Sequence, residues 1–208
     1  MLQIITGAIS LGLLWAVMTI GVYITYRILN IADLTVEGSI AMGAAIAAKA
    51  ITSGINPYIA TFLALIGGMA AGLVTGLLHT KLKIPALLSG ILTMIGLYSI
   101  NLRIMGKANI PLLRMETVYT PFENMGLDRN SAVIVLGLIC VLGLISILYW
   151  FFGTEIGCAI RATGNNPRMV SAQGINTNTT IILGLIISNG LVAFSGGLIA
   201  QNQSFADI

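Results

Sequence analysis

Long apolar runs recur along the whole chain, and they decide the environment in which it can fold. A helix that crosses a bilayer needs about 20 mostly apolar residues. Runs of that length, separated by short polar or turn-forming stretches, occur six times. We expect membrane spans at residues 4–27, 33–53, 57–79, 86–103, 131–152 and 179–200. The pattern predicts an all-α fold, a polytopic transmembrane helical bundle of about six spans.

The composition excludes a soluble protein. Hydrophobic residues make up 57% of the chain and charged residues 8%, whereas soluble domains carry about 25% charged residues. With so few charges, a water-facing surface would expose large apolar patches. In hydrocarbon, helices satisfy their own backbone polar groups, and we find no strand pattern. We therefore expect one multi-pass domain, residues 1–208, in the cell membrane, with the first run retained as a span rather than removed as a signal peptide.

No set of side chains suited to catalysis or metal binding is apparent. His79 is the sole histidine, and Cys140 and Cys158 lack the spacing of metal ligands. A membrane enzyme would need a nucleophile with its base, or a metal cluster. The net charge of +3 is spread along the chain, so there is no basic patch for nucleic acid. We expect no catalytic residue, no metal and no cofactor bound by this chain.

Small residues recur at every fourth position of the third run, at Ala64, Gly68, Gly72 and Gly76. Small side chains at this spacing let helix backbones approach closely in lipid. The pattern predicts a packing seam between helices, with a path for substrate as the alternative.

The segment between the last two predicted spans is too polar to cross the membrane. Residues 154–162 are expected to form a short helix, followed by a turn at residues 163–166. Asn166 is suited to cap a second short helix that has Pro167 at its first position and a glycine at its end. Two short helices around a fixed turn would make a rigid projection, here named the knob (residues 154–174). An ordinary interfacial loop is the alternative.

A family resemblance begins in this projection. The run from Arg161 to Pro167, which reads RATGNNP, resembles the cytoplasmic coupling segment of ABC importer permeases of the branched-chain amino acid and ribose type, the binding-protein-dependent transport system inner membrane components. Residues 30–39 resemble the start of the second core helix of that family, and residues 82–94 also resemble it. The resemblance follows most of the chain in order, and the coupling segment is its most specific part.

The resemblance implies a membrane-spanning permease subunit that takes up a small polar solute, such as an amino acid or a sugar. It implies a pore of two permease chains, identical or paralogous, in the lipid bilayer. It also implies ATP-binding subunits on the cytoplasmic side that use ATP and Mg²⁺, and an extracytoplasmic binding protein that delivers the solute. This chain would then not be an enzyme itself. An ATP-independent secondary transporter or channel is the alternative, although it leaves the knob unexplained.

The resemblance also orients the chain, which charge alone does not. With segment 153–178 inside, five Lys and Arg side chains fall on each side of the membrane. The family match places segment 153–178 in the cytoplasm as the coupling segment and residues 104–130 outside as an extracytoplasmic loop. Members of the family continue with further spans beyond the point that matches residues 201–208. We therefore expect this chain to be truncated at its C-terminus.

The expected contacts with the ATP-binding subunit lie in the knob, where Ile160, Met169 and Val170 would be apolar anchors. The full expected set is Glu155, Ile160, Arg161, Gly164, Asn165, Asn166, Pro167, Met169, Val170 and Gly174.

Polar side chains within the spans are the candidates for a translocation path. They are Glu37, Thr93, Ser188 and Asn189. A carboxylate in hydrocarbon is costly and usually faces a wet cavity or the bundle interior. For Glu37 a lipid-interface position is the alternative, and for Ser188 and Asn189 an interhelical hydrogen bond. Asp33 is expected in the first turn of its helix, where it and Glu37 could also pair with Arg27.

Overall fold

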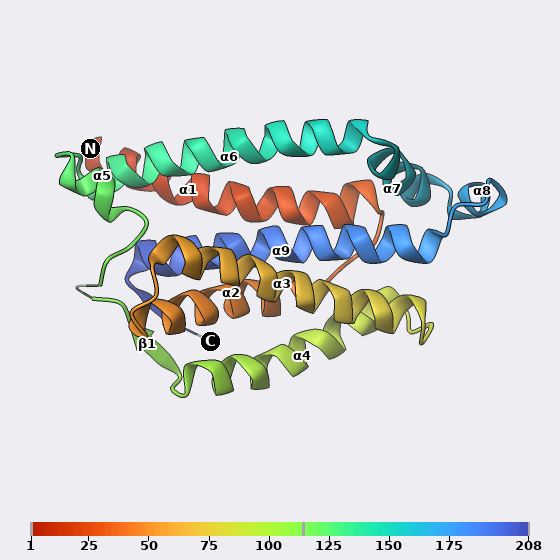
Figure 1. Ribbon diagram of the computed structural model, residues 1–208, viewed down its shortest axis with the longest axis horizontal. Helices are drawn as coiled ribbons and strands as arrows, with labels where there is room; N and C mark the ends of the chain where they lie inside the picture. The colour runs from red at the N-terminus through yellow and green to blue at the C-terminus, as the bar shows by residue number, and fades with distance from the viewer. Residues whose placement is uncertain (1, 114, 208) are drawn as a thin grey trace.

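The computed structural model describes residues 2–113 and 115–207 and shows a bundle of long helices that run roughly along one axis (Figure 1). The long helices are α1 (Leu2–Tyr23), α2 (Thr35–Thr52), α3 (Pro57–Thr80), α4 (Ala86–Met105), α6 (Arg129–Gly153) and α9 (Thr177–Gln203). The short helices are α5 (Thr120–Asn124), α7 (Glu155–Asn165), α8 (Pro167–Ala172) and the π-helix η1 (Ile24–Ile28), which continues α1. The predicted all-α bundle is confirmed.

Five of these helices are long and apolar enough to cross a membrane, where the sequence predicts six spans. The exception is α2, which lies at predicted span 33–53. It has 18 residues, about 27 Å at 1.5 Å per residue, and Glu37 and Lys49 lower its hydropathy. It nevertheless packs within the bundle against α3, α4 and α9. Protein neighbours rather than lipid surround much of this helix, so it needs less apolar character than a lipid-facing span.

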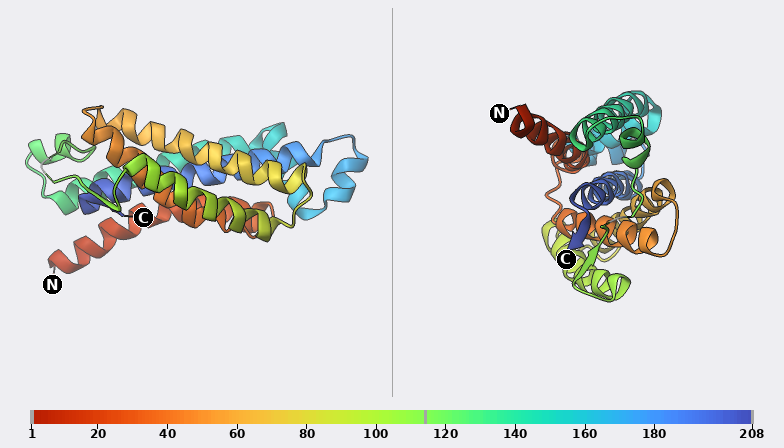
Figure 2. Two further views of the ribbon diagram at one scale, coloured as in Figure 1. Left: turned by 90° about the horizontal axis from the view of Figure 1, so that it is seen from below. Right: turned by 90° about the vertical axis from the view of Figure 1, so that its left-hand side faces the viewer.

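Helix α9 is the centre of the bundle. Seen along the long axis, it lies between the pair α1–α6 and the group α2–α3–α4 (Figure 2). The small residues of α3 pack directly on it: a β-carbon on Gly68 would collide with the carbonyl of Asn189, and one on Gly72 with that of Leu185. The predicted packing seam is confirmed, because no larger side chain fits between α3 and α9 at these positions.

The segment 106–128 folds over one end of the bundle instead of forming an open loop. Its strand β1 (Asn109–Pro111) pairs antiparallel with β2 (Phe205–Asp207), which follows α9. The expectation of no strand is therefore wrong for these two elements. Each has three residues, too few to show an alternating pattern in the sequence. The knob lies at the opposite end of the bundle, beyond α6 and α9 (Figure 1).

Candidate functional site

The local structure of the knob follows from its caps. Thr154 Oγ1 accepts a hydrogen bond from the backbone N–H of Gly157 at 3.3 Å and so caps α7. Asn166 Oδ1 accepts one from the N–H of Met169 at 3.1 Å, with Pro167 at the first position of α8. Gly174 has a positive φ of 83° just after α8, a conformation that glycine adopts without strain. The predicted second helix, its cap and its end are confirmed.

The first helix of the knob is longer than predicted. α7 continues through Asn165, so the expected turn at residues 163–166 reduces to Asn166 alone. Packing against other helices stabilises this extra turn. The hydroxyls of Thr163 and Thr180, at the start of α9, are hydrogen-bonded at 2.8 Å, and both side chains are buried.

A second contact seats the knob on the end of α1. Gly164 packs so closely against the backbone carbonyl of Ile28, in the π-helix, that a β-carbon would collide with it. Helix α7 therefore touches both the π-helix at the end of α1 and the start of α9. The knob is anchored to two membrane helices that are far apart in the sequence.

Two of the three predicted apolar anchors do not point outward. The side chain of Ile160 is 0% exposed and that of Val170 is 3% exposed, because they fill the space between the short helices and the bundle. This corrects the expectation that they present apolar surface to a partner. Met169 is 59% exposed, as expected, and Ile156, four residues before Ile160 on α7, is 53% exposed. The apolar surface that a partner can reach is therefore Met169 with Ile156.

The other expected coupling residues lie on the outside of the knob. Glu155, Arg161, Asn165, Asn166, Pro167 and Gly174 are exposed, and Gly164 is half-buried. Their contact with an ATP-binding subunit stays a prediction.

A buried polar cluster links α9 to α1 and α2. Asn189 donates through Nδ2 to Oδ2 of Asp33 at 2.7 Å, and the hydroxyl of Ser39 donates to Asn189 Oδ1 at 2.6 Å. Ser188 donates to the carbonyl of Gly21 at 2.7 Å. These are the interhelical hydrogen bonds that the sequence allowed for Ser188 and Asn189, and both side chains are fully buried.

Asp33 stabilises the start of α2 and does not form the expected ion pair with Arg27. Its Oδ1 accepts a hydrogen bond from the N–H of Thr35 at 2.9 Å, at the positive end of the helix dipole. Among the described residues, the one ion pair within 4.0 Å joins Arg129 and Glu123 at 3.2 Å, so Arg27 does not pair with Asp33 or Glu37.

Glu37 lies on a groove between α2 and α4. This groove has a volume of about 460 Å³ and is also lined by Met94, Tyr98 and Asn101. Asn101 is 1% exposed and donates to the carbonyl of Gly38 at 3.3 Å, but its Oδ1 has no hydrogen-bond partner among the described residues.

Asn101 is not among the residues predicted from the sequence, although a polar residue three positions after Tyr98 near the end of an apolar run is a usable signal. Thr93, on the same helix, is buried and donates to the carbonyl of Ser89 at 3.0 Å. Of the four residues proposed for a path, Glu37 is thus the one that lines the groove. A path role for all four stays a prediction.

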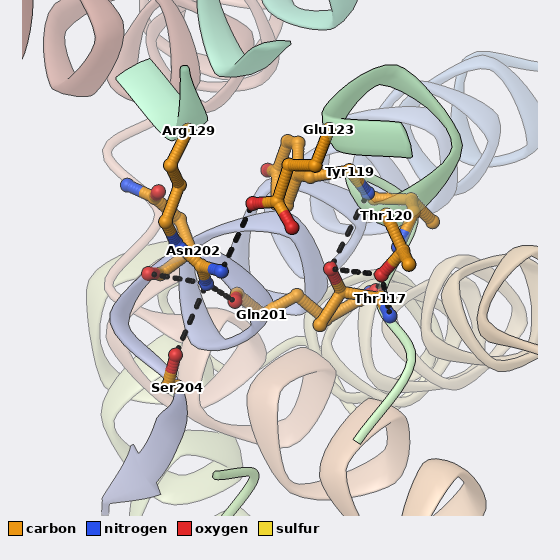
Figure 3. Close-up of polar contacts among 9 residues, drawn as sticks. Thr117, Tyr119, Thr120, Glu123, Arg129, Gln201, Asn202 and Ser204 are labelled. Carbon is orange, nitrogen blue, oxygen red and sulfur yellow. Dashed lines mark hydrogen bonds and ion pairs between the residues drawn. The ribbon is translucent and has the colours of Figure 1, made fainter. Parts of the chain in front are cut away.

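A polar cluster closes the opposite end of the bundle (Figure 3). The Nη2 group of Arg129 donates to the carbonyls of Gln201 and Asn202, at 2.9 and 3.1 Å, and to Oγ of Ser204 at 3.0 Å. These carbonyls belong to the last turn of α9, which lacks intrahelical donors and carries the negative end of the dipole. The cluster ties the start of α6 to the end of α9.

Segment 106–128 is held by the same cluster. Oε1 of the buried Gln201 accepts a hydrogen bond from the N–H of Val118 at 3.0 Å. The neighbouring Tyr119 is fully buried and donates its hydroxyl to the carbonyl of Leu198 at 3.0 Å. The pKa of Tyr119 is raised above its usual value, and burial of the phenol is the largest cause. The sequence predicted an extracytoplasmic loop at residues 104–130, without these contacts to α9.

Comparison with known proteins now decides the family. The model of the family described as branched-chain amino acid transport system / permease component matches residues 4–208. The chain belongs to this family. The predicted resemblance of the chain to ABC importer permeases is therefore confirmed.

Relatives with curated names agree. The chain is 45% identical, over 98% of its length, to a tyrosine transport system permease protein of Clostridioides difficile (strain R20291), and covers 66% of that protein. It is 27% identical, over 97% of its length, to a probable branched-chain amino acid transport permease protein LivH of Methanocaldococcus jannaschii, covering 67% of it. It is 28% identical, over 97% of its length, to an autoinducer 2 import system permease protein LsrC of Photorhabdus luminescens, covering 59% of it.

The chain thus spans about two thirds of the first two of these relatives and less of the third. No solved structure is significantly similar. The family and the five apolar helices identify a multi-pass inner-membrane permease component of the ABC importer type, a membrane subunit without catalysis of its own.

Proposed function

We propose that this permease imports an amino acid, or a related small polar solute, in an assembly with three kinds of partner. An ATP-binding subunit docks on the knob and uses ATP and Mg²⁺, a second permease chain completes the pore, and an extracytoplasmic binding protein delivers the solute. The observation that carries this proposal is the seating of α7 on both Ile28 and Thr180. A push on the knob reaches two membrane helices at once.

The knob has the stiffness that force transmission requires. Its two helices have capped ends, and α7 has no free space beneath Gly164. A partner that closes on ATP would bear on the exposed Met169 and Ile156. Such apolar anchors commonly supply most of an interface's binding energy, with about 2 kcal/mol or more lost when one is truncated.

We propose that the groove between α2 and α4 lines the path of the solute. Glu37 is exposed on it, and a carboxylate at membrane depth is costly unless water or a cationic partner reaches it. An amino acid's ammonium group could pair with the exposed carboxylate of Glu37. Tyrosine, which the name of one relative specifies, is the first solute to test, since its ring could stack near the exposed Tyr98.

The test of the coupling role is Met169→Asp in the whole importer. A buried charge in the docking surface should reduce copurification of the ATP-binding subunit and abolish substrate-stimulated ATP hydrolysis, while the isolated subunit still hydrolyses ATP. Leu82→Asp is the matched control, because Leu82 is also an exposed apolar residue but lies between α3 and α4, outside the knob. If Met169→Asp leaves both copurification and stimulated hydrolysis intact, the knob is only a loop.

A further inference from the structure

A cationic cavity lies where the π-helix at the end of α1 meets α7. It has a volume of about 530 Å³, and its polar lining includes Tyr23, Tyr26, Arg27, Asn30, Arg161 and Asn165. None of the described lining residues is acidic. Two guanidinium groups from distant parts of the chain thus share one cavity without a counter-charge in its wall.

These two arginines have most of their donors available. Arg27 has no hydrogen-bond or ion-pair partner among the described residues, and Arg161 donates to Sγ of Cys158 at 3.2 Å. The local backbone structure sets the position of Arg27. The π-helix widens the last turn of α1, and Asn30 then adopts a positive φ of 56° that turns the chain away toward α2. π-Helical turns are often found at functional sites.

An apolar groove beside this cavity lies between α1 and α6. It has a volume of about 380 Å³ and is lined by Ile20, Ile24, Ile145, Leu148 and Phe152. Tyr23 and Ile28 line both spaces, so the groove and the cationic cavity adjoin. A third cavity, of about 670 Å³, is lined by Arg161 and also by Leu148 and Phe152, which line the groove as well.

Aromatic side chains mark the level of the cavity in the membrane. Tyr23, Tyr26, Tyr149 and Trp150 are exposed at this end of α1 and α6. Tyr and Trp are enriched at the membrane–water interface, at the depth of the lipid headgroups. Arg27 and Arg161 therefore lie at headgroup depth, and the apolar groove lies at the depth of the acyl chains.

We propose that this composite surface binds an anionic phospholipid, with its phosphate between Arg27 and Arg161 and one acyl chain along the α1–α6 groove. Guanidinium groups hold phosphate through several charge-assisted hydrogen bonds. An anionic phospholipid has both the negative charge that the cationic cavity requires and the apolar chain that the adjoining groove requires. A free phosphate would leave the groove unused, and an acidic side chain of a soluble partner would not extend into it. The proposal needs only the membrane location of the chain and not its transport activity.

Native mass spectrometry of the full-length permease in detergent tests the headgroup site. With added dioleoylphosphatidylglycerol or dioleoylphosphatidylcholine, the wild-type protein should retain the anionic lipid preferentially. Arg27→Gln with Arg161→Gln should lower retention of phosphatidylglycerol by roughly ten-fold and remove the preference. Arg168→Gln, which removes the same charge from α8 outside the cavity, should retain the lipid like the wild type. Equal retention of both lipids by the wild type, or unchanged retention by the double variant, overturns the proposal.

Two further arms separate a lipid from the other occupants. Glycerol 3-phosphate, which has the head but no acyl chain, should compete poorly for the site, and Ile145→Trp, which fills the exposed groove, should weaken retention with both arginines intact. If glycerol 3-phosphate displaces the lipid at equal concentration, the site is for a soluble anion. If the double variant loses the ATP-binding subunit but keeps the lipid, the cavity belongs to that interface. Either result contradicts the proposal.

Discussion

Gly164 of α7 packs against the backbone carbonyl of Ile28 in a space that no β-carbon can enter. This contact makes the knob part of the transmembrane bundle rather than a tethered loop. A substitution there should disturb the transmission of movement without touching the exposed surface that a partner reaches.

The first prediction follows from that contact. Gly164→Val should push α7 off the π-helix, so the ATP-binding subunit should still copurify while substrate-stimulated hydrolysis falls by roughly ten-fold, about 1.4 kcal/mol. Gly153→Ala is the matched control, because a β-carbon there meets nothing within 4 Å, and it should behave like the wild type. Normal substrate-stimulated ATP hydrolysis in the Gly164 variant would show that the contact between Gly164 and Ile28 has no role in coupling.

The second prediction concerns the groove between α2 and α4. Glu37→Gln should insert and express normally but slow uptake of an amino acid by roughly ten-fold, because a neutral amide cannot pair with the ammonium group. Glu116→Gln, at an exposed residue at the opposite end from the knob, is the control for loss of a carboxylate. Wild-type uptake by Glu37→Leu would remove Glu37 from the path.

The third prediction fixes the orientation of the chain. On a background without cysteines, Asn165→Cys should react with an impermeant maleimide only from the cytoplasmic side. Met125→Cys, at the other end of the bundle and exposed, should react only from outside. Labelling of position 165 from outside would reverse the proposed topology.

The fourth prediction concerns Tyr119 and pH. Its hydroxyl donates to Leu198, so Tyr119→Phe should lower stability in detergent by about 1 kcal/mol near neutral pH. The pKa of the buried phenol is raised above its unfolded value of about 10. Below that pH the neutral form is present in both states, and as pH rises above about 10 the unfolded state ionises first, so stability falls. The melting temperature of the Phe variant should lack this alkaline loss, and that of Tyr98→Phe, an exposed tyrosine, should keep it. Equal alkaline curves for wild type and Tyr119→Phe would contradict the burial argument.

The parts that sequence reasoning predicted are those set by neighbours in the chain. Asn166 and Pro167 cap a helix through contacts within three residues, so the pattern sufficed. Ala64, Gly68 and Gly72 recur with helical spacing, which by itself indicates a packing face. The family motif at Arg161–Pro167 supplied the functional class.

The parts that sequence reasoning missed depend on distant partners. Ile160 and Val170 look like free anchors in the sequence, but α7 packs on the π-helix and on α9, α8 packs on α9, and both side chains are buried. Arg129 caps a helix end 72 positions away. The burial of the unpartnered Asn101 oxygen depends on the packing of α2 beside α4. No local sequence pattern predicts these contacts, since they depend on how distant helices pack in lipid.

The most direct test of the central claim is uptake by the whole importer in proteoliposomes. With the knob facing the ATP supply and the binding protein and tyrosine on the other side, uptake should require ATP and Mg²⁺ and should stop with Met169→Asp. Imposed proton or sodium gradients without ATP should drive none. Uptake driven by an ion gradient alone, unaffected by Met169→Asp, would contradict the account.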